Sequence, residues 1–411
     1  MQSIITRFSN TLQGVAQQLE DYEAKEAMVI HHDEADGLCS GAICKRMLEK
    51  LGYSVSNLCL DKLFPEVIKN LHAKEHNLYV YADMGSAHAP LISSYNKSRN
   101  FTLILDHHDP AKSEDPLVYN INPEFQGMSG ESDASASSVA YFFAKKLNNI
   151  NEDLAHLAII GTAEIPGPIK GLNKYVLDDA IKNRQVEIKK TKSGEDVKIL
   201  SVGRSYKRIS TMLSVLGSVG YYRDGPSMGM KACLESFDSE IESSVEKFEK
   251  ERKQANQRLL EELRLNGLNQ LKGIQWFHAG DNYNGMSGKV IGSFCSYLRF
   301  QRIVNPMKYL IGMMNMPQEI PGYGNLNKQY MKISSRVSER LAQLINRKNR
   351  PALSKILPEA CSKFDGFGDG HSVAASGVIL KGKEGEFVKE LDLLATQEIS
   401  SGRLDTFFVK A

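Results

Sequence analysis

Three short apolar runs in the N-terminal part of the chain each end on polar residues. The runs cover residues 27–30, 78–81 and 101–105. Nearly uninterrupted apolar runs of this length are typical of strands that are buried on both faces. The segments between them, such as 41–51 and 64–72, have helical patterns. This alternation predicts β-α-β crossovers, and therefore an α/β fold with a parallel sheet covered by helices.

The first 22 residues have their apolar positions at helical spacing. This pattern predicts an amphipathic helix that lies on the core of the protein. A helix on a membrane surface is the alternative, and it is disfavoured because the polar face of this segment is not basic.

A strongly charged stretch at 238–265 carries apolar residues at helical and near-heptad spacing. Arg252 stands where a coiled-coil seam requires an apolar residue, so we expect one long helix that connects two domains. This helix is expected to end at Asn266-Gly267. The remainder is rich in Gly and Met, and its strand-like runs predict a second, smaller α/β domain. The expected boundaries are 1–235 for the first domain, 236–268 for the connecting helix and 269–411 for the second domain.

The 411 residues include 51 Lys and Arg against 49 Asp and Glu, which gives a formal net charge of +2. This balance excludes binding to nucleic acid through gross positive charge alone, so any such binding must use local patches. The segment 181–208 is one candidate, with nine basic residues against three acidic ones. We expect a charged hairpin or loop there, either solvated or in contact with a polyanion.

The six cysteines form no CxxC pair and no cluster with histidine at zinc spacing. Free thiols in a reducing cytoplasm are the simplest interpretation. The sequence has no apolar run long enough to span a membrane, and its first residues lack the apolar core of a signal peptide. We therefore expect a cytoplasmic location and no membrane partner.

Polar residues that can bind a metal follow all three apolar runs, and the carboxyl ends of parallel strands meet at one edge of a sheet, so we expect a single site. Carboxylate oxygens bind hard divalent cations, and imidazole shifts the preference toward Mn²⁺ or another transition metal. Two such ions can activate a water and hold both reacting oxygens of a phosphoester. An aspartate at a strand end can instead cap the next helix, but that explanation fits one cluster better than three. The candidate ligands are His32, Glu34, Asp36, Asp83 and His107.

Asp106-His107-His108 follows the third apolar run, and an H-x-E-x-D-G stretch at 32–37 follows the first. These motifs resemble those of the DHH phosphoesterase superfamily, and within it those of the archaeal RecJ-like nuclease group. Residues similar to the family's other motifs follow in the same order, and the resemblance spans roughly 26–405. They are Tyr81-Ala82-Asp83-Met84-Gly85-Ser86, Asn122-Pro123 with the Ser- and Ala-rich segment 132–140, and Gly366-Phe367-Gly368-Asp369-Gly370-His371, which resembles the signature of the DHH-associated C-terminal domain.

The resemblance implies a nuclease domain that holds two Mn²⁺ or Mg²⁺ ions, joined by the long helix to a domain that binds single-stranded nucleic acid. It implies an exonuclease that releases mononucleotides from single-stranded DNA in replication or repair, with RNA as a second candidate substrate. By motif position, His107 is expected to bind a metal, Asp106 to orient a neighbour or bind a metal, and His108 to lie near the scissile phosphate. Similarity to archaeal members favours 3′-to-5′ polarity.

Two segments of the second domain are expected to bind phosphates of the substrate. The sequence Lys332-Ile333-Ser334-Ser335-Arg336 resembles a family strand whose arginine binds phosphate, and Ser335 and Arg336 are the candidates there. Gly368 and Gly370, beside His371, are the other candidates. A glycine-rich turn can direct consecutive backbone N–H groups at an anion, although the same residues also suit an ordinary tight turn.

Two positions depart from the family pattern. Glu34 stands where the first motif usually has aspartate, and the added methylene moves the carboxylate by about an ångström. Asp33 could take this role instead through a one-residue bulge. In the fourth motif, Glu164 is the remaining candidate ligand where an aspartate is usual. The two glutamates indicate either mutual accommodation or the loss of a metal site.

The main alternative is a protein of the replication fork that binds partners without catalysis, like the eukaryotic helicase cofactor that shares this fold and has lost metal ligands. The resemblance to archaeal members also implies binding to the GINS complex of the replicative helicase, which is compatible with nuclease activity. A phosphodiesterase for very short oligonucleotides is a third hypothesis. A pyrophosphatase is less favoured, because the basic stretches at 181–208 and 328–355 suggest a longer polyanion.

Overall fold

Two compact units make up the chain. The N-terminal unit comprises residues 1–251, 285–287 and 319–326, and the C-terminal unit comprises 252–284, 288–318 and the residues from 327 onward. The computed structural model describes residues 2–24, 26–74, 77–147, 149–191 and 194–397.

The division between the units falls within helix α10 (Ser239–Asn266), which corresponds to the helix expected at 238–265. The expected domain boundaries at 236 and 268 stay predictions. Two short segments from the second half of the chain, 285–287 and 319–326, belong to the N-terminal unit. No helix in the described ranges has both the length and the apolar character that crossing a membrane requires.

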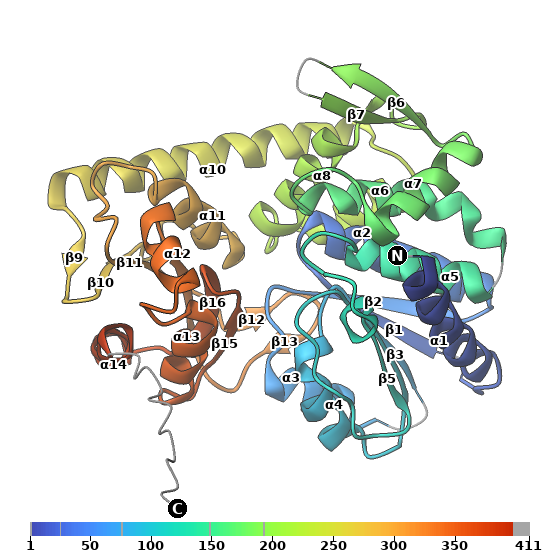
Figure 1. The fold of residues 1–411 in the computed structure, drawn as a ribbon, viewed down its shortest axis with the longest axis horizontal. Helices are drawn as coiled ribbons and strands as arrows, with labels where there is room; N and C mark the ends of the chain where they lie inside the picture. The colour runs from blue at the N-terminus through green and yellow to red at the C-terminus, as the bar shows by residue number, and fades with distance from the viewer. Residues whose placement is uncertain (1, 25, 75–76, 148, 192–193, 398–411) are drawn as a thin grey trace, which may run out of the picture. The chain divides into compact units, whose positions relative to one another are not determined.

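A five-stranded parallel sheet forms the centre of the N-terminal unit, in the order β2-β1-β3-β4-β5 (Figure 1). The predicted strands are β1, β3 and β4, and they are neighbours in the middle of the sheet. Every residue of β3 and β4 is buried, which explains their apolar sequences. The expected parallel α/β sheet is confirmed. Its strands are β1 (Glu26–His32), β2 (Ser54–Leu60), β3 (Leu78–Ala82), β4 (Phe101–Leu105) and β5 (Val118–Ile121).

Helices cover both faces of this sheet (Figure 1). Helices α1 (Gln2–Glu20), α2 (Ala35–Lys50) and α5 (Ala136–Leu147) lie on one face, and α3 (Pro65–Leu71) and α4 (Ala89–Asn96) lie on the other. Helix α1 is the expected amphipathic helix, and it buries Phe8, Leu12 and Leu19. The remaining helices of four or more residues are η2 (Pro123–Gln126), η3 (Asn149–Leu154), α6 (Ala155–Gly161), α7 (Gly171–Lys182), α8 (Tyr206–Ser214), the π-helix η5 (Val215–Val219) and α9 (Gly225–Leu234).

A hairpin contains most of the basic segment at 181–208. It is built from β6 (Val186–Thr191) and β7 (Gly194–Ile199) and is extended by β8 (Arg204–Ser205). Its register places Glu187 opposite Lys198 and Lys189 opposite Asp196. Opposite charges at paired positions offset one another, which favours the solvated alternative over contact with a polyanion.

Six strands form the sheet of the C-terminal unit, in the order β15-β16-β14-β11-β10-β9. Strands β10 and β11 pair in parallel, and the other neighbouring strands pair antiparallel. Helix α11 (Lys289–Leu298) packs on one face, and α12 (Glu339–Asn346), α13 (Leu353–Ser362) and α14 (Glu384–Thr396) bury the main core of the unit against the other. A second α/β domain is therefore confirmed. The strands are β9 (Asn269–Gln270), β10 (Ile274–His278), β11 (Tyr309–Asn315), β14 (Tyr330–Arg336), β15 (Phe367–Gly370) and β16 (Ala374–Leu380).

The glycine-rich segment at 366–371 contributes strand β15 rather than the turn expected from the sequence. This strand pairs antiparallel with β16, and Gly368 lies opposite Gly377. A Cβ atom on Gly377 would lie 2.7 Å from the carbonyl oxygen of Phe367, so the two backbones require glycine here. Gly370 has a φ angle of 140°, which residues with a side chain rarely adopt.

Candidate metal centre

Asp83 is the first residue after strand β3, and it is almost fully buried. Its backbone has a φ angle of 64°, in the left-handed region, and its N–H donates to the carbonyl oxygen of Leu105 at 3.0 Å. Aspartate adopts this conformation at lower cost than most residues, but the conformation is still strained. Buried strain of this kind is concentrated at functional sites.

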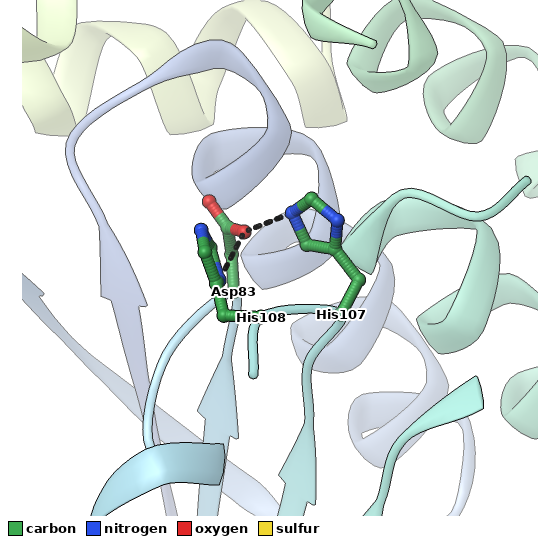
Figure 2. A group of neighbouring side chains, drawn as sticks. All are labelled: Asp83, His107 and His108. Carbon is green, nitrogen blue, oxygen red and sulfur yellow. Dashed lines mark ion pairs between the residues drawn. The ribbon is translucent and has the colours of Figure 1, made fainter. Parts of the chain in front are cut away.

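The Asp-His-His motif follows strand β4, the neighbour of β3, and places two imidazoles beside Asp83 (Figure 2). The Oδ1 atom of Asp83 lies 3.5 Å from His107 Nε2 and 3.9 Å from His108 Nδ1. One ligand atom from each of these three residues lies within 4.8 Å of the other two. The ends of β3 and β4 lie side by side, as the sequence predicted, and they bring a carboxylate and two imidazoles together.

His107 is oriented through the ring nitrogen that faces away from Asp83. Its Nδ1 atom lies 2.8 Å from the carbonyl oxygen of Gly130 and donates to it. This bond keeps a proton on Nδ1, so Nε2 is the nitrogen whose lone pair becomes available to a metal when the ring is neutral, as in metal-binding histidines. A Cβ atom on Gly130 would lie only 1.7 Å from the carbonyl oxygen of His107, so this close contact requires glycine.

Three residues of the first motif complete the cluster. Asp36 lies in the first turn of α2, and its Oδ2 atom is 3.8 Å from His107 Nε2. The same carboxylate accepts N–H bonds from Ala136 and Ser137, at the start of α5. At the end of β1, His32 Nδ1 lies 3.8 Å from Asp83 Oδ2 and 4.0 Å from Glu34 Oε2.

Asp106 uses its carboxylate to organise the motif. Its Oδ1 atom accepts from the N–H groups of His107 and His108 at 2.7 and 3.2 Å, and from His108 Nδ1 at 2.7 Å. Its Oδ2 atom accepts from the N–H of Ser86 at 2.9 Å. Of the two roles expected for Asp106, this geometry favours orienting a neighbour. The Nδ1 atom of His108, which lies 3.9 Å from Asp83 Oδ1, is bonded to Asp106, and the role of His108 near the scissile phosphate stays a prediction.

Glu164 makes different contacts from the other candidate ligands. It lies in the short helix η4 (Thr162–Glu164), where its Oε1 atom accepts from the N–H of Ala35 at 2.9 Å and from the hydroxyl of Ser214 at 3.1 Å. The carboxylate thus caps the N-terminus of α2. Metal binding by Glu164 stays a prediction.

The electrostatics of the cluster fit a divalent cation. Burial raises the pKa of Asp83 to about 6. Burial on its own lowers the pKa of His107, but the neighbouring carboxylates, Asp83 first, outweigh it and raise the pKa to about 10. Burial likewise opposes ionisation of Asp106, whereas the His108 ring holds its pKa well below the usual range. Asp83 Oδ1 is buried and accepts no hydrogen bond. A buried carboxylate oxygen among imidazoles and carboxylates suits Mn²⁺ or Mg²⁺.

In the C-terminal unit, Arg336 ends strand β14. Its Nε atom donates to Ser296 Oγ at 2.9 Å, and its Nη1 atom donates to Ser334 Oγ at 3.1 Å and to the Ser335 carbonyl oxygen at 2.9 Å. The Ser335 side chain is fully buried. Since alternate residues of a strand share a face, Ser334 and not Ser335 lies on the face of Arg336. Substrate binding by Ser335 and Arg336 stays a prediction.

The other predicted phosphate-binding residues lie on the β15–β16 hairpin. Gly368 and Gly370 belong to β15, and the N–H of His371 donates to the carbonyl oxygen of Ala374 at 2.7 Å. This bond closes the hairpin, so the N–H of His371 is used within the fold. Contact of Gly368, Gly370 and His371 with substrate likewise stays a prediction.

Sequence reasoning did not single out several residues that support the site. Asn122 donates from Nδ2 to the carbonyl oxygen of His108 at 2.7 Å, and Ser86 and Gly130 hold Asp106 and His107. Ser86 and Asn122 stand inside motifs that the sequence analysis quoted, so the motifs were a usable signal. Gly130 had no such signal, because its role depends on a contact made only in the folded chain.

Comparisons with known proteins find a family match for part of the N-terminal unit. Residues 26–162 match the DHH family, N-terminal domain. A stretch of 169 residues, 39% of this chain, is 35% identical to an uncharacterized protein of Methanocaldococcus jannaschii and covers 38% of that protein.

Solved structures of two proteins, among others, share the fold. One is RecJ from Thermus thermophilus in complex with Mn²⁺, with a TM-score of 0.64 and 16% identity over 94% of this chain and 54% of that chain. Another structure of that RecJ contains Mg²⁺. The other is CDC45 from Entamoeba histolytica, with a TM-score of 0.56 and 12% identity over 95% of this chain and 99% of that chain.

The N-terminal unit is a parallel α/β sheet whose carboxyl edge carries a cluster of carboxylates and imidazoles. Residues 26–162 match the N-terminal domain of the DHH family, and the chain has a RecJ-like fold. The resemblance stated from the motifs is therefore confirmed. The chain spans about half the length of the Thermus RecJ and matches little more than a third of the M. jannaschii protein.

Proposed function

We propose that this protein is a metal-dependent exonuclease that hydrolyses single-stranded DNA to mononucleotides in DNA replication or repair. RNA is a second candidate substrate, the proposed polarity is 3′-to-5′ and the proposed location is the cytoplasm. The observation that carries the proposal is the meeting of Asp36, Asp83 and His107 at the carboxyl ends of neighbouring parallel strands. Asp83 Oδ1, which is buried and accepts no hydrogen bond, is the natural centre of a metal site.

Two Mn²⁺ or Mg²⁺ ions are the proposed cofactors, and when bound they supply Lewis acidity and an activated water for phosphodiester hydrolysis. The proposed ligands are His32, Glu34, Asp36, Asp83 and His107, with Glu164 as a further candidate.

His108 is the proposed catalytic residue that contacts the scissile phosphate. Asp106 binds its Nδ1 atom at 2.7 Å, and about half of the His108 side chain is exposed. The ring is therefore held in one orientation with Nε2 available to a ligand. In this orientation His108 donates a hydrogen bond or a proton to an oxygen of the phosphodiester.

The C-terminal unit supplies the proposed contacts to the sugar-phosphate backbone. Arg336 is the main candidate, because a guanidinium group binds phosphate through several fixed donors. Ser335, Gly368, Gly370 and His371 are proposed to assist it. Contacts to phosphate carry no base specificity, which is consistent with an exonuclease that degrades any sequence.

The test is degradation of end-labelled single-stranded DNA with Mn²⁺, Mg²⁺ or EDTA. We expect metal-dependent release of mononucleotides by the wild type and no release by Asp83→Asn or His107→Ala. Asp61→Asn is the matched control, because Asp61 is also buried and follows strand β2 of the same sheet. This control should keep its activity. Release of label from only one end establishes the polarity, and equal inertness of wild type and variants on DNA and RNA contradicts the proposal.

A replication-fork scaffold that binds the GINS complex is the second candidate. It is favoured by the similarity of the fold to CDC45 and by the use of Glu164 as a helix cap. The test is co-sedimentation of the whole chain with purified GINS, in parallel with the nuclease assay. Binding to GINS without nuclease activity would favour the scaffold, and binding with activity would mean that both functions coexist.

A further inference from the structure

Asp33 is fully buried and stands in the sequence between His32 and Glu34, two proposed metal ligands. Its carboxylate faces Ser287 and the Nε2 side of the His32 ring. One carboxylate oxygen, Oδ2, accepts a hydrogen bond from the hydroxyl of Ser287. The other, Oδ1, lies 3.5 Å from Nε2 of His32. Asp33 thus connects His32 to a serine that is far away in the sequence but belongs to the same unit.

His32 presents its two ring nitrogens to different neighbours. The Nε2 atom faces Asp33, whereas Nδ1 faces the carboxylates of Asp83 and Glu34 at 3.8 and 4.0 Å. A carboxylate on one edge of an imidazole holds the proton on that nitrogen, and the lone pair of the other nitrogen is then available to a metal. The ring of His32 has this arrangement.

Ser287 and Asp33 are both held by the segment around the π-helix η5. The N–H of Ser287 donates to the carbonyl oxygen of Ser218 at 2.8 Å. Gly217 packs so closely on Asp33 that a Cβ atom there would lie 1.9 Å from the carbonyl oxygen of Asp33. A π-helix is an uncommon element that occurs often at functional sites. Here it fixes the loop that carries Asp33 and Glu34.

We infer that Asp33 is a positioning residue for the metal ligand His32, and that Ser287 and the π-helix η5 hold Asp33 in place. This inference rests on the proposed metal-dependent function. It also decides between the two interpretations of the first motif: Asp33 does not replace Glu34 as a ligand, because its carboxylate lies on the opposite edge of the His32 ring from Asp83. A carboxylate beside the second ring nitrogen of a metal-binding histidine orients the ring and raises its affinity for metal.

The experiment measures Mn²⁺ binding to the full, metal-stripped chain by the loss of the electron paramagnetic resonance signal of free Mn²⁺. Asp33→Asn keeps the volume of the side chain and should weaken binding by about 10- to 100-fold. Ser287→Ala should weaken it in the same direction but less, because Asp33 keeps its charge. Asp61→Asn is the control for a general loss of negative charge, because it removes a buried carboxylate from the end of the neighbouring strand β2. It should change the affinity for Mn²⁺ by less than about twofold.

A double-mutant cycle separates positioning from direct binding. If Asp33 acts through His32, Asp33→Asn should cause no further loss of Mn²⁺ affinity in a His32→Gln chain. If Asp33 is itself a ligand, the two losses should add. Thermal unfolding of the metal-free variants identifies any variant that weakens binding only because it is poorly folded, and Ser287→Ala is the milder change if Asp33→Asn proves unstable.

Three results overturn the inference. They are unchanged Mn²⁺ affinity in both Asp33→Asn and Ser287→Ala, additive losses in the cycle, and an equal loss in Asp61→Asn. If the wild type itself binds no Mn²⁺, the proposed metal-dependent function fails together with the inference. If the wild type binds Mn²⁺ and the variants match it, only the role of Asp33 and Ser287 is lost.

Discussion

Asp106 and His108 are joined by a hydrogen bond of 2.7 Å between Oδ1 and Nδ1, although they are only two residues apart. The Asp106 side chain is buried, whereas about half of the His108 side chain is exposed. The motif therefore contains an orienting carboxylate, a largely buried imidazole near Asp83 and an accessible imidazole.

His108→Ala should lower kcat on single-stranded DNA by about 10²- to 10⁴-fold, because a positioned acid or hydrogen-bond donor is removed. Binding of Mn²⁺ should stay close to that of the wild type, since the remaining cluster is intact. Asp106→Asn should lower kcat similarly and also reduce the free energy of unfolding by about 1–3 kcal/mol, because three backbone N–H groups lose a charged acceptor. A loss of Mn²⁺ binding in His108→Ala would instead make His108 a metal ligand.

Gly130→Ala should disrupt the site by steric conflict. A methyl group at this position would lie 1.7 Å from the carbonyl oxygen of His107, so the backbone of the motif must shift. We expect a loss of about 1–3 kcal/mol in the free energy of unfolding, together with weaker Mn²⁺ binding. Gly14→Ala is the matched control, because nothing lies within 4 Å of a Cβ atom on this glycine in α1. It should raise the stability by up to about 1 kcal/mol.

Binding of Mn²⁺ should release protons and should strengthen as the pH rises. In the metal-free chain the pKa of His107 is about 10, so the ring is protonated at pH 8, whereas a metal ligand must be neutral. Calorimetry at pH 8 in two buffers of different ionisation enthalpy should show release of about one proton per protein. An enthalpy independent of the buffer would show that His107 does not bind the metal.

Acid should destabilise the metal-free chain through His72, which packs away from the candidate metal centre. Its ring bonds to Asn96 Oδ1 and Tyr81 Oη, both at 2.9 Å, and burial lowers its pKa to about 4 from an ordinary value of 6.5. Between these pH values the unfolded chain binds the proton and the folded chain does not, so stability falls as the pH falls. The shift corresponds to roughly 3 kcal/mol.

Denaturant titrations between pH 7 and pH 4 check this prediction. His72→Gln should lower the free energy of unfolding at pH 7, because Asn96 and Tyr81 lose the ring that they contact. It should also reduce the slope of the unfolding free energy against pH by the equivalent of about one bound proton. His31, whose pKa burial also lowers to about 4, should account for part of the slope that remains. A slope that His72→Gln leaves unchanged would mean that His72 is already charged in the folded state.

The sequence predicted the centre of the fold better than its edges. Strands β3 and β4 are buried at every position, and burial on both faces leaves a nearly continuous apolar run. Strand β2 lies at one edge of the sheet and is largely exposed, so its sequence mixes polar and apolar residues and it was not identified. Strand β5, at the other edge, is partly exposed in its middle and was missed for the same reason.

The site residues show the same contrast between local and long-range information. His107 and Asp83 follow buried strands, so local pattern and strand geometry were enough to place them together. Ser287 reaches Asp33 from a distant part of the chain, and no pattern around either residue indicates the contact. Ser334 was passed over for Ser335 because only the alternation of the strand, known once its bounds are known, shows which serine lies beside Arg336.

The separation of the ligands among three strand ends also sets the order of events during folding. His32, Glu34 and Asp36 follow β1, Asp83 follows β3 and His107 follows β4, so the full set of proposed ligands comes together only when these three strands stand side by side. Parallel strands pair only after long connections close, which makes this a slow step. If the proposed site binds Mn²⁺, full affinity for the ion should therefore appear at the rate at which the central strands come together.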